Sequence, residues 1–478
     1  MRGETGLRLG LVAAVAAALL VLGLTSSEWG LYGDAAGYWS LSSSFDRGGR
    51  FALEGYEDRL RGYVVPLMLW GVRQLAARLS VDPLVMFRVC SALVGALTFA
   101  LVLPALVARL LGLRPSLRGA AMFAFLGVLF WWGHFLHPLS DFPALFLLSS
   151  GLLLLPHQID GRWSAPAAVL AGICLGLAAI ARPINLATLA VVTGLVGWYA
   201  VRHRTRWTAV TSALLFVAGI WLAVWPQSSV NGRIFDTRNP FARARVGERA
   251  PSLYLQQLVW GLSIQRYETN LDGVFPVAVM FTDPGGQALL GLNPAQDPRF
   301  LPYVANTTYS SYLALTVRHP FMYAVLVGRH LFNGLDVAYA TPYVARLTPR
   351  SLPLAVLNYV VLCLAAGAVI HGRPRRYDVN TAWRIGVGAA FIAAALLAIP
   401  TAIECRFLLP LWMLAYGTVA FGLAHPKPPP LTAPRRSVPG AAILAAAVAL
   451  CVLLATLTYS HILGAPSSYR VWCFSCLP

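Results

Sequence analysis

Residues 89–108 have the sequence VCSALVGALTFALVLPALVA, in which no side chain is charged. A helix that crosses a bilayer needs about 20 mostly apolar residues, because it must satisfy its own backbone hydrogen bonds. This stretch therefore predicts a membrane-spanning helix. Eight further runs have the same character, at 9–27, 119–140, 183–201, 207–232, 351–372, 385–403, 407–426 and 437–469, and two shorter charge-free runs lie at 142–156 and 163–181. We expect an all-α, polytopic membrane protein with about eleven transmembrane helices.

The composition agrees with a location in lipid. Apolar residues make up 58% of the 478 residues and charged residues only 12%, against about 25% charged residues in ordinary soluble domains. The formal charge of +18 would suit nucleic-acid binding, but the basic residues sit in short clusters between apolar runs, as loop anchors do. Lys427 stands beside 36 arginines, which is typical of a GC-rich genome and fits a bacterial source.

The first apolar run poses a choice between a signal peptide and a retained helix. No cleavage site of the A-x-A kind follows it, and Trp29 and Tyr32 resemble interface anchors. We therefore expect a retained helix.

The short loops predict the orientation of the chain. Clusters of basic residues near 109–118, 202–206, 373–376 and 427–436 fall on the same side as Arg2 and Arg8. The positive-inside rule makes that side cytoplasmic and places the C-terminus outside the plasma membrane. On this topology only Glu4, Asp160 and Asp378 among the 19 acidic residues face the cytoplasm. Acid-dependent chemistry is therefore expected on the extracytoplasmic face.

Loop lengths divide the chain into four parts. We expect an N-terminal membrane part at 1–226, whose first outer loop (25–87) carries the candidate catalytic acid, and a large extracytoplasmic loop or cap at 227–350. C-terminal transmembrane helices at 351–464 and an outer tail at 465–478 follow. Proline and glycine predict short helices and turns in the large loop, with an interfacial helix at 320–335.

In the tail, Cys473 and Cys476 could form a disulfide. They do not predict a zinc site, because no second pair of cysteines at zinc-ligand spacing accompanies them.

An acid lies just after the first span, in the segment YGDAAGYWSL at 32–41. Asp34 and Tyr38 are four residues apart, so they share one face of a helix. A carboxylate so close to the membrane indicates a functional role. The alternative is that Asp34 caps a helix that begins at Ala35.

A second acid lies at the outer junction of two spans, in the segment HFLHPLSDFP at 134–143, which also contains His137. Its two prolines break the helix and free backbone polar groups, which is tolerated only beside protein or water. The segment therefore predicts a water-accessible pocket beside Asp141. The alternative is that Ser140 or Asp141 caps the next helix.

Several arginines are expected at the same outer level. Arg182 needs a partner there, either a lipid phosphate or a carboxylate such as Asp141, or it snorkels to ordinary headgroups. Glu404 and Arg406 lie near the outer end of a late span and could also neutralise one another, and Arg88 stands at the outer start of the second span. Carboxylates and guanidiniums together suit a site that holds a phosphate and orients or deprotonates a hydroxyl.

The chain resembles GT-C fold glycosyltransferases of the protein mannosyltransferase and lipid A aminoarabinose transferase type, over about residues 7–424. The motifs that carry the resemblance are Asp34-x-x-x-Tyr38, Met86-Phe87-Arg88-Val89, Ser140-Asp141, Ala181-Arg182-Pro183, Arg318-His319-Pro320 and Glu404-x-Arg406-Phe407-Leu408-Leu409-Pro410. The order of these motifs and their positions relative to the predicted spans carry the resemblance.

The resemblance implies an enzyme that moves a sugar from a polyprenyl phosphate to an acceptor at the outer membrane face. It implies that Asp34 is the catalytic base, that Asp141 aids acceptor or metal binding, and that Arg182 and Arg406 hold the donor phosphate. The expected substrate-binding residues are Tyr38, Arg88, His137, Asp141, Arg182, Glu404 and Arg406. The sugar stays open, with arabinofuranose and mannose among the choices, as does the acceptor, which could be a cell-wall glycan, a lipid or a protein.

Two departures from the family pattern limit what the resemblance implies. The mannosyltransferases carry Asp-Glu at the first acidic position, whereas this chain has Asp34-Ala35, which argues against protein O-mannosylation. Neither outer loop has an Asp-x-Asp motif, which argues against a required divalent metal, and no other cofactor is expected.

Two other classes of protein share this hydrophobicity. A transporter or a flippase for lipid-linked sugars would place charged residues near the middle of its spans, whereas these lie at span ends. A non-catalytic scaffold explains the apolar runs but not the acids expected to converge at the outer surface.

Overall fold

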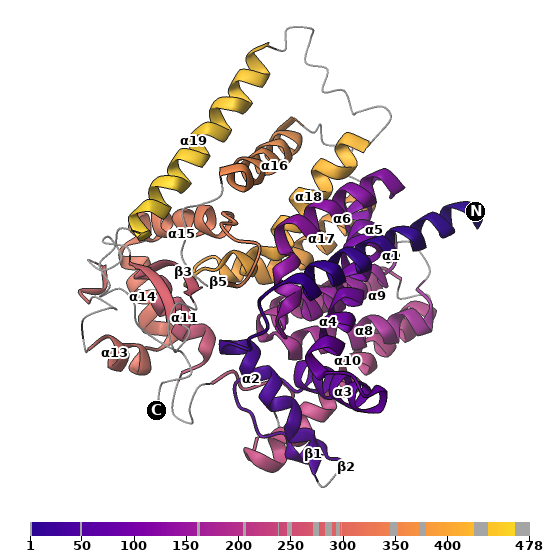
Figure 1. The fold of residues 1–478 in the computed structure, drawn as a ribbon. Helices are drawn as coiled ribbons and strands as arrows, with labels where there is room; N and C mark the ends of the chain where they lie inside the picture. The colour runs from indigo at the N-terminus through magenta and orange to yellow at the C-terminus, as the bar shows by residue number, and fades with distance from the viewer. Residues whose placement is uncertain are drawn as a thin grey trace. The chain divides into compact units, whose positions relative to one another are not determined.

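The computed structural model describes most of the chain, and helices dominate it (Figure 1). The described residues are 2–47, 50–159, 163–203, 207–237, 239–245, 251–270, 277–282, 289–292, 297, 299–344, 352–371, 379–424 and 438–463. The chain divides into two compact units. The first consists of 1–243, 373–394 and 416–425, and the second of 244–372, 395–415 and 426–478.

The first unit is a bundle of apolar helices. Its elements are α1 (Arg2–Thr25), α2 (Gly33–Leu41), β1 (Asp46–Arg47), β2 (Arg50–Phe51), α3 (Val64–Leu79), α4 (Pro83–Leu97), α5 (Leu103–Leu110), α6 (Leu117–Trp131), α7 (Asp141–Leu153), α8 (Ala165–Ala181), α9 (Leu186–Arg202) and α10 (Trp207–Ile234). A π-helical turn at Thr98–Val102 joins α4 to α5. The helices α17 (Val379–Ala398) and α18 (Leu409–Ala424) contribute residues to both units.

The second unit combines helices with a small sheet. Its elements are α11 (Leu253–Gly261), β3 (Ile264–Asn270), β4 (Val277–Thr282), α13 (Phe300–Asn306), α14 (Tyr309–Arg318), α15 (Pro320–Gly334), β5 (Tyr343–Val344), α16 (Leu352–His371) and α19 (Val438–Leu463). Strand β3 pairs antiparallel with β4 and parallel with β5, in the order β4-β3-β5. The sequence predicted helices and turns in this region, and the sheet was not predicted.

The predicted class, a multi-pass helical membrane protein, is confirmed. Eight helices among the described residues are long and apolar enough to cross a bilayer, at Thr5–Thr25, Pro83–Leu110, Leu117–Leu136, Pro183–Arg202, Trp207–Ile234, Leu352–Ile370, Val379–Ala398 and Cys405–Ala424. Three further apolar helices are shorter, at Asp141–Leu153, Ala165–Ala181 and Ala442–Thr458. The count of about eleven transmembrane helices stays a prediction.

Glycines allow the backbones of α8 and α10 to touch. A Cβ on Gly172 would lie 2.1 Å from the carbonyl oxygen of Phe216, and a Cβ on Gly219 would lie 2.2 Å from that of Val169. Gly172 and Gly176 are four residues apart, the small-xxx-small spacing by which membrane helices approach closely. This contact fixes the end of α8, which leads into Arg182.

The helices of the first unit have two distinct ends. At one end Arg8 of α1 donates to the carbonyl oxygen of Pro115 at 2.9 Å, and Arg109 of α5 donates to that of Leu153 at 3.0 Å. The start of α1, the loop before α6 and the last turns of α5 and α7 therefore share this end. We call it the Arg109 end, and its predicted cytoplasmic location stays a prediction.

Replacing Gly172 by alanine is expected to lower the thermal stability of the protein, because the new methyl group meets backbone atoms of α10 that cannot move away cheaply. Overpacking of this kind costs about 1–3 kcal/mol. Thermal unfolding of detergent-solubilised protein measures the effect. The control is Gly194→Ala on α9, where a Cβ would meet nothing within 4 Å. Equal melting temperatures for the two variants would contradict the packing described here.

Candidate active site

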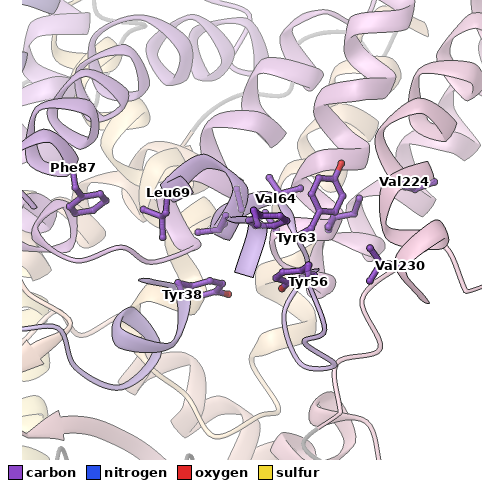
Figure 2. Packing of buried hydrophobic residues seen from close by; sticks show 13 residues of the cluster. Tyr38, Tyr56, Tyr63, Val64, Leu69, Phe87, Val224 and Val230 are labelled. Atoms are coloured by element: carbon purple, nitrogen blue, oxygen red, sulfur yellow. The ribbon is translucent and has the colours of Figure 1, made fainter. Parts of the chain in front are cut away.

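The first loop predicted at 25–87 is anchored in the first unit by an aromatic cluster. Tyr38 of α2, Tyr56 of the loop and Tyr63 before α3 are buried with Phe87 of α4 and Val224 of α10 (Figure 2). Buried aromatic side chains contribute large apolar areas to a core. The loop is therefore packed onto α4 and α10.

The loop meets α8 and α10 at Gly62 and Tyr63. The amide N–H of Tyr63 donates to the side-chain oxygen of Gln227 at 3.1 Å, and the Tyr63 hydroxyl donates to the carbonyl oxygen of Ala223 at 2.9 Å. A Cβ on Gly62 would lie 2.2 Å from the carbonyl oxygen of Ile180. Glycine is required there because two backbones touch, and this contact brings the neighbouring Arg61 to the end of α8.

Arg61 is held by its own loop. The Asp58 carboxylate accepts the backbone N–H groups of Leu60 at 2.7 Å and of Arg61 at 2.5 Å. The Tyr56 hydroxyl donates to the carbonyl oxygen of Arg61 at 2.7 Å. Burial works to lower the pKa of the Arg61 guanidinium, but Asp34 and Tyr38 outweigh it and the pKa is raised.

The Arg61 guanidinium contacts both residues of the Asp34-x-x-x-Tyr38 motif. Its Nη2 donates to Oδ1 of Asp34 at 2.7 Å, and its Cζ lies 5.0 Å from the centre of the Tyr38 ring, within cation–π range. The side chain of Asp34 is 53% exposed, whereas that of Arg61 is 17% exposed. The helix begins at Gly33 and receives no side-chain cap, so the alternative of Asp34 as a helix cap is wrong.

Tyr38 links α2 to the start of α7. A hydrogen bond joins its hydroxyl to the side chain of Ser140. Burial is the main reason that the pKa of Tyr38 is raised, with a further contribution from the charge of Asp34. The hydrogen bond to Ser140 and the charges of Arg61 and Arg182 oppose this rise. The phenol therefore stays neutral at physiological pH, and it lies within electrostatic reach of three charged side chains.

Asp141 and Arg182 form an ion pair between α7 and the end of α8. Nη1 of Arg182 donates to Oδ1 of Asp141. The side chain of Asp141 is only 3% exposed, and that of Arg182 is 22% exposed. The predicted carboxylate partner of Arg182 is thus confirmed. Ser140 occupies the N-cap position of α7 but makes no side-chain cap hydrogen bond, and Asp141 lies in the first turn of the helix.

These contacts form one continuous polar cluster across the first loop, α7 and α8. We call it the acid–arginine cluster, and its members are Asp34, Arg61, Tyr38, Ser140, Asp141 and Arg182. The sequence singled out Asp34, Tyr38, Asp141 and Arg182 as site residues, named Ser140 only as a motif residue and possible helix cap, and did not single out Arg61. No local signal distinguished Arg61 from the other arginines, because its importance comes from contacts with residues distant in the chain.

Arg88 and His137 lie in buried surroundings. Arg88 donates to the carbonyl oxygens of Gly23 and Glu28, and its guanidinium lies over the Trp29 ring with Cζ 3.5 Å from the centroid. These contacts position the chain that leaves α1. The His137 ring is also buried, 6.4 Å from the ring of Tyr32. The expected substrate contacts of both residues stay predictions.

Glu404 and Arg406 belong to the second unit and pair with each other. Nε of Arg406 donates to Oε2 of Glu404, and the two side chains are 12% and 10% exposed. The alternative that they neutralise one another is therefore confirmed. The preceding Ala402 donates its N–H to the carbonyl oxygen of Gln257 at 3.1 Å, which ties this segment to α11. The expected roles of Glu404 and Arg406 in holding a donor stay predictions.

Metal ligands do not gather anywhere in the part of the chain that the structure describes. No group of three or more histidine, cysteine, aspartate or glutamate side chains is placed to hold an ion there. Cys473 and Cys476 lie outside the described residues.

Comparison with known proteins gives one distant structural likeness. No protein-family model matches the sequence, and no curated protein matches it. The fold is similar to a solved structure of the archaeal oligosaccharyltransferase AglB from Archaeoglobus fulgidus, in complex with an inhibitory peptide and a dolichol-phosphate. The identity is 13% and the TM-score 0.40, over 95% of this chain. The chain spans 56% of the length of that protein.

The hydrogen bond between Tyr38 and Ser140 is expected to couple the first loop to α7. Tyr38→Phe and Ser140→Ala each remove one partner, and the double variant removes both. Denaturant unfolding of the four proteins in detergent should give a coupling energy of about 0.5–1.5 kcal/mol, the net contribution of one hydrogen bond. Strictly additive effects would mean that the two hydroxyls do not interact.

Proposed function

We propose that the protein is an integral-membrane glycosyltransferase that moves a sugar from a polyprenyl phosphate to an acceptor hydroxyl on the extracytoplasmic face. The observation that carries the proposal is the acid–arginine cluster, which holds an accessible carboxylate and an accessible guanidinium in one connected set of contacts. The sequence resemblance to GT-C glycosyltransferases supports the same activity. The site is proposed to lie outside the cytoplasm, because the Arg109 end carries the arginine-rich short loops.

Asp34 is the proposed general base. Its side chain is 53% exposed, so a substrate hydroxyl can reach the carboxylate, and Arg61 fixes the orientation of one carboxylate oxygen. A correctly placed base contributes about 10² to 10⁴ in rate. The Tyr38 ring supports this arrangement through its cation–π contact with the Arg61 guanidinium.

Arg182 is the proposed ligand of the donor phosphate. Guanidinium groups bind phosphate through charge-assisted hydrogen bonds that are about twice as strong as neutral ones. Because the Asp141 side chain is almost fully buried, we propose that it positions Arg182 and does not contact the substrate. With two carboxylates and two guanidiniums, the cluster holds the phosphate through directed hydrogen bonds and not through an excess of positive charge.

The proposed reaction is a single displacement. The acceptor hydroxyl transfers its proton to Asp34 as its oxygen attacks the anomeric carbon. The bond from that carbon to the phosphate oxygen breaks, and the polyprenyl phosphate leaves with the electron pair, stabilised by Arg182. Attack from the face opposite the leaving group inverts the anomeric configuration. Product stereochemistry tests this step, and a retained configuration would rule out single displacement.

Asp34→Asn is expected to lower kcat by about 10²- to 10⁴-fold, because the amide cannot accept the acceptor proton. Binding of the donor should change little, since the amide keeps the size of the side chain. Transfer from a panel of radiolabelled polyprenyl-phospho-sugars measures the rate. The control is Glu57→Gln, which changes an exposed acid of the same loop. Undiminished transfer by the Asp34 variant would refute the assignment of the base.

Loss of Arg182 is expected to weaken donor binding. Arg182→Gln alone leaves the buried Asp141 carboxylate unpaired, which is destabilising. The Asp141→Asn/Arg182→Gln double variant removes both charges and should keep the fold. We expect its donor Kd to rise about 10- to 100-fold, from the loss of a charge-assisted contact. Donor-induced thermal stabilisation reports the Kd, and an unchanged Kd would exclude Arg182 from the phosphate site.

A transporter or flippase is distinguished from an enzyme by the fate of the donor. Asp141 is the first residue of α7, and Arg182 follows the last residue of α8, so both charges lie at helix ends. A transport site is more often built near the middle of the spans. Proteoliposomes that translocate the lipid-linked sugar without hydrolysis or transfer would favour transport.

A further inference from the structure

A polar cavity lies at the Arg109 end of the first unit. Its volume is about 330 Å³, and its described lining consists of Arg109, Gly112, Leu113, Arg114, His157, Gln158, Asn380 and Arg384. These residues come from the end of α5, the loop that follows it, the segment after α7 and the first turns of α17. Asp141 and the carbonyl groups that bind Arg109 lie at opposite ends of α7, which spans about 20 Å. The cavity is thus separate from the acid–arginine cluster.

The cavity concentrates positive charge. Three of its described lining residues are arginines, and none of the described lining residues is a carboxylate. Arg109, Arg114 and Arg384 form no ion pair with any carboxylate in the described ranges. The pKa of His157 is lowered by burial and by the charges of Arg109 and Arg384. Burial is the larger cause of this shift, and the two arginine charges add to it.

Two of the arginines are held in place by the fold. Arg109 donates to the carbonyl oxygens of Leu153 at 3.0 Å and Leu155 at 3.1 Å, at the C-terminal end of α7. Arg384 rests against Gly112, whose φ is +68° and where a Cβ would lie 2.0 Å from Nη1 of the guanidinium. Glycine is thus suited to this position both by its backbone angle and by the space that Arg384 occupies.

Guanidinium groups that the fold holds around a cavity favour the binding of an anion with several acceptor oxygens. A phosphate group fits, because guanidinium N–H groups bind its oxygens in pairs. Basic pockets at the ends of membrane helices also bind anionic lipid headgroups. A zwitterionic headgroup fits less well, because its cationic part would meet the same arginines.

We propose that this cavity binds a phosphate group, carried by an anionic lipid or by a soluble phosphate. Arg114 and Arg384 contact the phosphate oxygens, while Arg109 contributes charge from the wall of the cavity. A lipid source places the headgroup in the cavity and its acyl chains beside the apolar helices, whereas a soluble source needs the phosphate alone. The proposal is independent of the transferase activity.

The test uses the full-length protein, delipidated in detergent. Short-chain phosphatidylglycerol, phosphatidylcholine of equal chain length and inorganic phosphate are titrated separately, and binding is followed by native mass spectrometry and by the melting temperature. Arg114→Gln/Arg384→Gln is compared with Arg118→Gln, which changes an exposed arginine outside the described lining. Arg114→Gln alone, on an exposed loop, serves if the double variant does not fold.

We expect wild-type protein and Arg118→Gln to bind at least one of the two phosphate probes, phosphatidylglycerol or inorganic phosphate, at least about tenfold more tightly than Arg114→Gln/Arg384→Gln does, with the single Arg114 variant in between. Binding of phosphatidylglycerol in preference to phosphatidylcholine identifies a lipid source. Binding of inorganic phosphate, lost in the same variants, identifies a soluble source. If neither probe binds, or if binding is the same in all variants, the proposal is wrong.

Discussion

The ion pair between Asp141 and Arg182 is the contact on which the candidate site depends. Both residues lie where an apolar helix begins or ends, and the Asp141 side chain is almost fully buried. A buried charge is costly unless it is paired, so α7 and the end of α8 must stay together for either charge to be tolerated. The pair thereby fixes two helix ends against each other and keeps a partly exposed guanidinium beside Tyr38.

The tight packing of α8 on α10 makes this arrangement possible. Gly172 and Gly219 remove the side chains that would separate the two backbones. Because α10 also binds Tyr63 through Gln227 and Ala223, the first loop is attached to the same pair of helices. A membrane interior offers little hydrophobic force between helices, so such close backbone contacts carry much of the packing. Apolar packing thus supports a polar site.

The two ends of the first unit differ in their charge chemistry. In the acid–arginine cluster, each guanidinium is paired with a carboxylate. Such pairs suit a site that accepts a proton from one group and binds a phosphate through another. Around the cavity at the Arg109 end, the described arginines make no such pairs, and their charge is offset only by backbone carbonyl groups and neutral side chains. That environment suits stable binding of an anion. The same residue type, arginine, serves two different purposes because the local partners differ.

The sequence by itself determined the helical membrane class and the candidate acids and arginines at helix ends. Those features are local, since a run of about 20 apolar residues specifies a spanning helix wherever it occurs. Only the tertiary structure decided which charges meet. It paired Asp34 with Arg61, 27 residues away, which the sequence did not predict. For Arg182 it selected Asp141, 41 residues away, from the partners that the sequence had left open. The tertiary structure also decided that Arg88 contacts the backbone at the end of α1 and that β4, β3 and β5 form a sheet. Such contacts depend on how helices pack, and composition alone does not specify their register.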